Sequence, residues 1–83
     1  MWIRTQNKYI LANVNSIRIC KCDIDGDVYY SIHGHYDRYE QSLGYYSTKE
    51  KALSVLDEIQ RFIYHIDNLY ATFQMPQDEE VEL

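Results

Sequence analysis

The sequence predicts an α+β domain in which an antiparallel sheet of four to five strands is covered on one face by one long C-terminal helix. Three observations predict it. Apolar and polar residues alternate over short runs in the first half of the chain, and Asp25-Gly26 is typical of a tight hairpin turn. After Ser47, apolar residues recur at steps of three and four. Strands followed by a helix are typical of the α+β class.

Five strands are expected before the helix. Polar turn residues separate them, and the fifth strand is short. The expected ranges are Trp2 to Thr5, Tyr9 to Val14, Ser16 to Asp23, Val28 to Tyr36 and Ser42 to Tyr46. Residues 37–41 are expected to form a polar loop.

The turn at Asp25-Gly26 sets the register of the third and fourth strands. If these two residues form the loop, Ile19 faces Ile32 and Cys20 faces Ser31. The pairs Cys22–Tyr29 and Arg18–His33 follow from the same register. Because side chains alternate across a strand, the core face is expected to carry Ile17, Ile19, Val28, Tyr30 and Ile32. The opposite face is expected to carry Arg18, Cys20, Cys22, Tyr29, Ser31, His33 and His35.

The helix is expected to run from Thr48 to about Gln74, where Pro76 ends it. Ser47 is expected as its N-cap, with Glu50 completing a capping box. A helix of this length would measure roughly 40 Å, which exceeds the ~17–20 Å of a typical strand.

The distal half of such a helix needs its own cover. A fold-back near 65–68, a partner, or a second copy of the chain would each provide one, and we favour a homodimer because large bare apolar stripes are rare on soluble monomers. The expected dimer interface is Phe62, Ile63, Ile66, Leu69, Tyr70 and Phe73.

Charge and length bound the organisation of the chain. The 83 residues carry a net charge of −5, but five basic and five acidic residues balance between Met1 and Gln41. We expect a single α+β domain over 1–76 and an acidic flexible tail over 77–83. Without a membrane-length apolar stretch or a signal peptide, we expect no membrane association and a cytoplasmic protein, bacterial or in a host cell if phage-encoded. The thiols are expected to be reduced.

Four side chains raise the question of metal or thiol chemistry. Cys20, Cys22, His33 and His35 are the right types of ligand for zinc, so a zinc- or thiol-dependent protein is one alternative. Alternate residues on a strand stand roughly 6.5–7 Å apart, which suits tetrahedral coordination poorly. We therefore expect no metal and no cofactor. A Cys20 nucleophile with His33 as its base would lack an orienting carboxylate, an oxyanion hole and a pocket, so we also expect no enzymatic activity.

Aromatic and basic residues gather on the open sheet face and the loop that follows. Such residues form hot spots in protein interfaces and also stack on nucleic-acid bases. The expected partner-binding set is Arg18, Tyr29, His33, His35, Tyr36, Arg38 and Tyr39. A single-stranded nucleic-acid binder is the alternative, and the near-neutral charge of this half favours a protein partner.

Two segments carry a resemblance to known proteins. The runs WIRTQNKYILANVNSIRI and LGYYSTKEKALSVLDEI resemble short uncharacterised proteins of low-GC Gram-positive bacteria and their phages, over roughly Met1 to Phe62. The shared motifs are structural, namely N-terminal hairpins and a capped C-terminal helix, so no active-site residue is carried over. The resemblance implies a bacterial or mobile-element source and the sheet-plus-helix fold. Small acidic phage proteins of this kind are often inhibitors of host defence enzymes, such as anti-CRISPR proteins. With the tyrosine-rich face and the apolar helix, this leads us to expect a non-enzymatic protein-interaction module and, more narrowly, an inhibitor of that kind encoded by a phage or mobile element.

Overall fold

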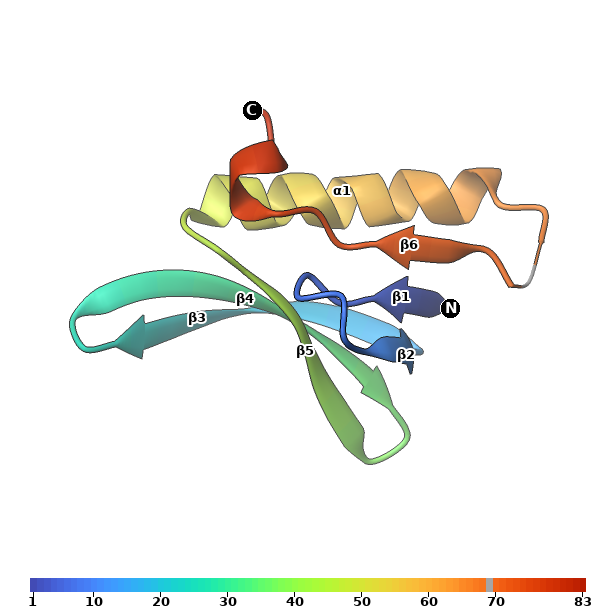
Figure 1. Ribbon diagram of the computed structural model, residues 1–83, viewed down its shortest axis with the longest axis horizontal. Coiled ribbons are helices and arrows are strands. Elements are labelled where there is room, and N and C mark those ends of the chain that lie inside the picture. The colour runs from blue at the N-terminus through green and yellow to red at the C-terminus, as the bar shows by residue number, and fades with distance from the viewer. Residues whose placement is uncertain (69) are drawn as a thin grey trace.

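A computed structural model of the chain describes residues 1–68 and 70–83 and confirms the α+β class (Figure 1). The elements are β1 (Trp2–Arg4), β2 (Leu11–Asn13), β3 (Ser16–Ile24), β4 (Asp27–Tyr36), β5 (Tyr39–Tyr46), α1 (Lys49–His65), β6 (Thr72–Gln74) and a 3-10 helix, η1 (Asp78–Glu80). They form two three-stranded sheets, ordered β2-β1-β6 and β3-β4-β5. The prediction of one sheet with four to five strands is therefore wrong. The two sheets stay separate because β1 takes β2 and β6 as its neighbours.

The register of the β3–β4 hairpin is confirmed. Ile19 pairs with Ile32 and Arg18 with His33, as the two-residue turn requires. Asp25 and Gly26 have φ angles of 52° and 86°, the two positive values that a type I′ turn needs. Val28 was expected in the core, but it is 39% exposed. The reason is that the end of the hairpin projects beyond α1 (Figure 1).

The fifth strand begins earlier than predicted. Asp37 adopts a positive φ of 56°, so the chain reverses within two residues and β5 starts at Tyr39 rather than Ser42. The expected 37–41 loop is thus a second hairpin. An irregularity in the β4–β5 register between Ile32 and His33 accompanies an extra residue, Leu43, that is buried in the core.

The helix is shorter than predicted and begins one residue later. Thr48, not Ser47, is the N-cap, and its hydroxyl accepts a hydrogen bond from the Lys51 amide at 3.1 Å. The helix ends at His65 instead of near Gln74, and the extended Ile66 follows it. The local reason is a polar turn, because the side chain of Asn68 accepts from the amide of Tyr70.

The chain then folds back along the helix. β6 runs parallel to β1, and the ring of Phe73 packs edge-to-face on Phe62 with centroids 5.5 Å apart. The same apolar residues that mimic a long helical stripe in the sequence therefore divide between two elements. The fold-back, one of the three covers considered, occurs within the chain.

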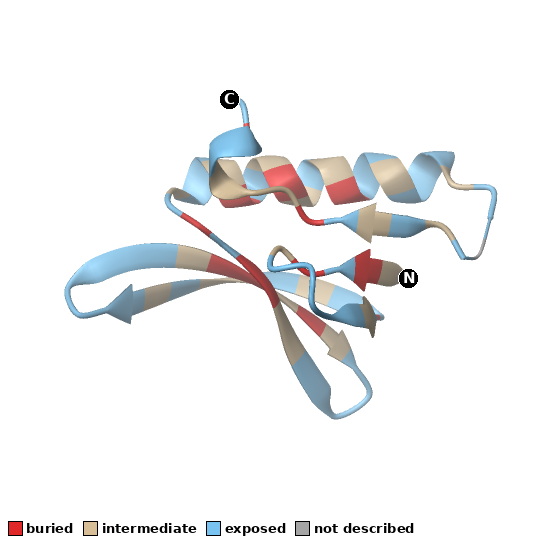
Figure 2. Cartoon of the chain, viewed as in Figure 1, coloured by how far each residue is buried: buried red, intermediate tan, exposed pale blue. Residues whose placement is uncertain are grey.

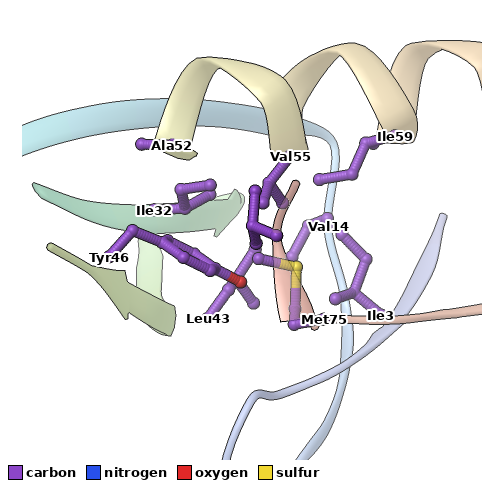
Figure 3. Close-up of a cluster of buried hydrophobic side chains, with 10 residues drawn as sticks. Ile3, Val14, Ile32, Leu43, Tyr46, Ala52, Val55, Ile59 and Met75 are labelled. Carbon is purple, nitrogen blue, oxygen red and sulfur yellow. The ribbon is translucent and has the colours of Figure 1, made fainter. Parts of the chain in front are cut away.

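The core lies between α1 and the paired strands β4 and β5 (Figures 2 and 3). Its members come from both sheets, the helix and the C-terminal segment; they are Ile3, Val14, Ile32, Leu43, Tyr46, Ala52, Val55, Ile59, Met75 and Val81. The backbone at Gly34 approaches Val14 so closely that a Cβ there would lie 2.5 Å from a Val14 methyl carbon. The approach of β4 to the N-terminal segment therefore requires glycine.

The acidic C-terminal segment is docked on the domain rather than extending away from it as a solvated tail. Asp78 accepts hydrogen bonds from the backbone and hydroxyl of Ser47, and Gln77 donates from its side chain to the Gln6 carbonyl. Val81 is buried. The C-terminal segment packs on the domain despite its acidic residues because the apolar side chains of Met75 and Val81 are buried there. Among residues 1–68 and 70–83, no helix combines the length and apolar character needed to cross a membrane.

Candidate functional site

The face of the β3-β4-β5 sheet that points away from α1 carries most of the predicted site residues. We call it the open face. Strand alternation and the observed pairings place on it Arg18, Cys20, Cys22, Tyr29, Ser31, His33, His35, Glu40, Ser42 and Tyr45. The predicted face is therefore confirmed for β3 and β4, and β5 extends it.

Glu40 lies at the centre of a polar cluster on this face. Its Oε1 accepts from Arg18 Nη2 at 2.8 Å and lies 2.9 Å from His33 Nδ1. Arg18 Nε donates to His35 Nε2 at 3.1 Å, and Arg18 Nη1 donates to the Cys20 sulfur. Because His35 Nε2 acts as an acceptor, it carries no proton in this arrangement, and its 3.7 Å approach to Glu40 is not an ion pair.

Ser31 and His33 connect this cluster to the second cysteine. Ser31 Oγ lies 2.7 Å from His33 Nε2 and 3.3 Å from Cys22 Sγ. His33 Nδ1 is buried and, within the described residues, makes no hydrogen bond, although it lies 2.9 Å from Glu40 Oε1. The order of groups is thus serine, histidine and carboxylate, as in acyl-transfer enzymes.

The burial of Ser31 argues against acyl transfer by this group of residues. Ser31 has no exposed surface, so its hydroxyl is closed to a substrate. The described hollows are lined by other residues than Ser31 and His33. An oxyanion would need free N–H donors, and the amides of a central strand such as β4 are occupied on both sides. The Ser31–His33 contact instead connects neighbouring side chains of the sheet.

The predicted zinc ligands are not gathered round a common point. In the part of the chain that the structure describes, no group of three His, Cys, Asp or Glu side chains could hold a metal ion. Cys20 and Cys22 are free thiols, and the partners of His33 and His35 are Ser31 and Arg18. These four side chains are committed to hydrogen bonds along the sheet.

Two tyrosines border the polar cluster. Tyr45 lies opposite Ser31 on β5, and Tyr29 lies two residues before Ser31 on β4. Both rings are partly exposed, at 46% and 36%. The predicted set included Tyr29 but not Tyr45.

The other predicted aromatics lie elsewhere. Tyr36 and Tyr39 oppose each other at the end of the β4–β5 hairpin, and alternation turns them to the face opposite His35. Arg38 lies in the turn between them. The predicted set therefore divides into an open-face group and a hairpin-end group.

Glu40 is the main residue that the sequence reasoning missed. The polar run 37–41 predicts a loop there, whereas the structure has a tight turn at Asp37-Arg38 followed directly by β5. Placing a two-residue turn there would have set Glu40 opposite His35, as observed. The signal was Asp37, a residue type that tolerates positive φ.

The predicted dimer residues do not lie on one helix, because α1 ends at His65. Phe62 and Phe73 pack on each other, Ile66 is half-buried, and Ile63 and Tyr70 are exposed. Leu69 lies outside the described residues. A single uncovered stripe is therefore absent from the described positions, and a homodimer through this segment stays a prediction.

The fold and its surfaces define a small α+β domain with one exposed, polar and aromatic sheet face. Comparison of the chain with protein-family models, curated proteins and solved structures found no match.

Proposed function

We propose that the chain is a non-enzymatic protein-interaction module that contacts its partner through the open face. One observation carries the proposal: Tyr29 and Tyr45, both partly exposed, border a hydrogen-bonded cluster centred on Glu40. Tyrosine provides a large contact area with little loss of conformational entropy. A cluster already held by hydrogen bonds reduces the ordering cost of binding.

Charge favours protein over nucleic acid as the partner. Arg18, the basic residue of the open face, is paired with Glu40 at 2.8 Å. A nucleic-acid platform needs free cations to contact phosphates. A neutral, tyrosine-bordered face suits a protein surface better.

The resemblance to short phage and bacterial proteins supports a narrower proposal. In it, the chain is encoded by a phage or mobile element and acts in the cytoplasm as an inhibitor of a host protein. An inhibitor of this kind acts by occupying a surface, so it needs no catalytic group. The open face is the surface that we assign to this contact.

The test is covalent capture of partners with matched tyrosine variants. Tagged protein is cross-linked in a lysate of low-GC Gram-positive cells, and captured proteins are quantified for wild type, for Tyr29→Ser with Tyr45→Ser, and for Tyr64→Ser with Tyr70→Ser. The control tyrosines are each 80% exposed and lie off the open face. We expect at least one protein to be lost with the open-face pair and kept with the control pair. Equal capture by all three forms would refute the assignment of this face.

Two further measurements address the alternatives. Anisotropy of labelled single strands at two salt concentrations detects nucleic-acid binding, and salt-sensitive binding lost in Arg18→Ala would favour that alternative. Elemental analysis of wild type, Cys20→Ser and Cys22→Ser detects zinc. Stoichiometric zinc that disappears in either variant would favour the metal alternative.

A further inference from the structure

We infer that the groove between the outer edge of β3 and α1 binds an extended segment of a partner protein, which adds to the sheet as a strand beside β3. The segment carries apolar side chains at alternate positions and an acidic residue at one end. This surface is separate from the open face and goes beyond the function proposed above.

The first supporting observation is the edge of β3. Within the described residues, β3 has a strand neighbour only in β4, although it is nine residues long. Since Ile24 and Asp27 flank the two-residue turn, the backbone groups of Arg18, Cys20 and Cys22 point to β4. Those of Ile17, Ile19 and Lys21 point outward. Unpaired edges of this kind accept extended peptides.

By contrast, the opposite edge of the same sheet is covered by the chain itself at Leu43 and Tyr45. At β5, the backbone of Gln6 donates to the Leu43 carbonyl, and the Gln6 side chain bonds both the amide and the carbonyl of Tyr45. The chain thus covers one edge of the sheet and leaves the other open.

The second observation is the groove beside the open edge. Helix α1 packs over β4 and β5, so the inner side chains of β3 are only half covered. Two adjacent hollows of about 280 and 430 Å³ follow β3 along the helix. Their helical wall is a stripe of residues three and four apart, Lys49, Leu53, Leu56, Gln60 and Ile63, together with the buried Ile59. Their β3 wall is Ser16, Ile17, Ile19 and Lys21.

The walls carry apolar surface that the domain itself leaves exposed. Ile63 is 51% exposed and Leu53 is 42% exposed, while Ile17 and Ile19 are half-buried. Every second side chain of an added strand would face these residues. Its apolar side chains would therefore complete the burial of the groove.

The charges in the groove favour a segment that carries an acidic residue. The charged side chains that line the two hollows are Lys21 and Lys49, both in the same hollow, in a chain whose net charge is −5. The α-ammonium group of Met1, at the other hollow, is already hydrogen-bonded to Asn13 Oδ1 and the Val14 carbonyl. An acidic residue on the incoming segment would offset the charge of the two lysines. A second copy of the chain fits less well, because two copies repel each other through their net charge and each β3 edge presents Lys21.

The experiment uses two capped peptides of about seven residues, long enough to run beside β3 at ~3.3 Å per residue. Threonine fills the outward positions, and the inward positions carry Glu, Ile, Ile in one peptide and the reverse order in the other, so that both strand directions are tested. We expect one of them to bind, with a Kd of roughly 10–1,000 μM by calorimetry. Hydrogen exchange at Ile17, Ile19 and Lys21 should slow on binding.

N-methylation tests the strand geometry. Two versions of the bound peptide carry methyl groups on alternate amides. Only one set of amides points at β3, so one version should lose binding and the other should keep it. Equal binding by both versions would overturn strand addition.

Charge reversal tests the acidic position. Lys21→Glu should weaken binding roughly threefold to tenfold, and replacing the peptide glutamate by lysine should restore it. Arg61→Glu imposes the same change in net charge on exposed helix surface outside the groove and should have little effect. Equal losses in Lys21→Glu and Arg61→Glu would refute the charge contact.

Two outcomes separate this inference from others. Binding should persist in Tyr29→Ser with Tyr45→Ser, so failure of the open-face proposal leaves the groove untouched. Absence of binding by both peptides at millimolar concentration would overturn the inference. A dimer in sedimentation whose β3 edge amides are already protected would also overturn it, in favour of a second copy.

Discussion

The side-chain amide of Gln6 pairs with the backbone of Tyr45 as a neighbouring strand would. Gln6 Nε2 donates to the Tyr45 carbonyl at 3.0 Å, and Gln6 Oε1 accepts from the Tyr45 amide at 2.9 Å. Gln6 Nε2 also reaches the Pro76 carbonyl at 3.2 Å. One side chain therefore links the two sheets to the C-terminal segment and closes the edge of β5.

Gln6→Ala should destabilise the domain by about 1–3 kcal/mol, because backbone groups of Tyr45 and Pro76 lose their partners. The free energy of unfolding from urea denaturation measures this. Gln41→Ala is the matched control: Gln41 Nε2 donates only to its neighbour Ser42 among the described contacts, and its removal should change stability by less than about 0.5 kcal/mol. Equal losses of stability in Gln6→Ala and Gln41→Ala would show that the hydrogen bonds of Gln6 to Tyr45 and Pro76 do not stabilise the domain.

Gly34→Ala should cost about 1–3 kcal/mol, because the added methyl group would overlap the side chain of Val14. Val14→Ala removes the overlapping methyl groups. In a double-mutant cycle, the alanine at position 34 should therefore cost much less when residue 14 is also alanine. Additive effects of the two changes would contradict this account of the close approach.

The carboxyl group of Asp78 should make the free energy of unfolding depend on pH in the acid range. Burial tends to raise the pKa of this carboxyl, but hydrogen bonds from the Ser47 backbone and hydroxyl and the nearby Lys51 charge together lower it below its ordinary value of 3.8. A lowered folded-state pKa means that the stabilisation is present above the unfolded-state pKa and is lost as pH falls through the folded-state pKa. Asp78→Asn should therefore reduce stability at pH 7, by roughly 0.5 kcal/mol, because the carboxylate is 36% exposed and solvent screens its attraction to Lys51.

The same pair of proteins provides the pH test. Urea denaturation between pH 7 and about pH 2.5 should show the difference between wild type and Asp78→Asn shrinking toward the acid end. A difference that stays constant with pH would rule out a role for the charge. Asn retains an acceptor for Ser47, so the comparison isolates the carboxylate.

Phe73→Ala should destabilise the domain by about 1–3 kcal/mol, because it removes the edge-to-face contact with Phe62 and part of the cover of the helix. Tyr70→Ala, at an 80% exposed site on the same segment, should change stability by less than about 0.5 kcal/mol. Sedimentation of wild type tests the predicted homodimer at the same time. If Phe62 and Phe73 met a second copy instead, the effect of Phe73→Ala would grow with protein concentration.

Much of the candidate site could be read from local signals. The Asp25-Gly26 turn, the β3–β4 register and the shared face of Arg18, His33 and His35 were all predicted and are observed. The position of Glu40 depends on a tight turn at Asp37, where the polar composition predicts a loop instead. An error at a single turn changes the partner of every residue in the strand that follows.

The sequence by itself determined the α+β class, the central hairpin, and the start of the helix to within one residue. These features depend on interactions between residues close in the chain, namely turn conformation, side-chain alternation and helix capping. The end of the helix, the separation into two sheets and the docking of the C-terminal segment were decided only by the tertiary structure. Phe73 fits a helical stripe as well as a short strand, and its pairing beside β1 with a contact to Phe62 selects the strand. Contacts so distant in sequence leave no local pattern, because their stabilisation appears only when both segments are already folded together.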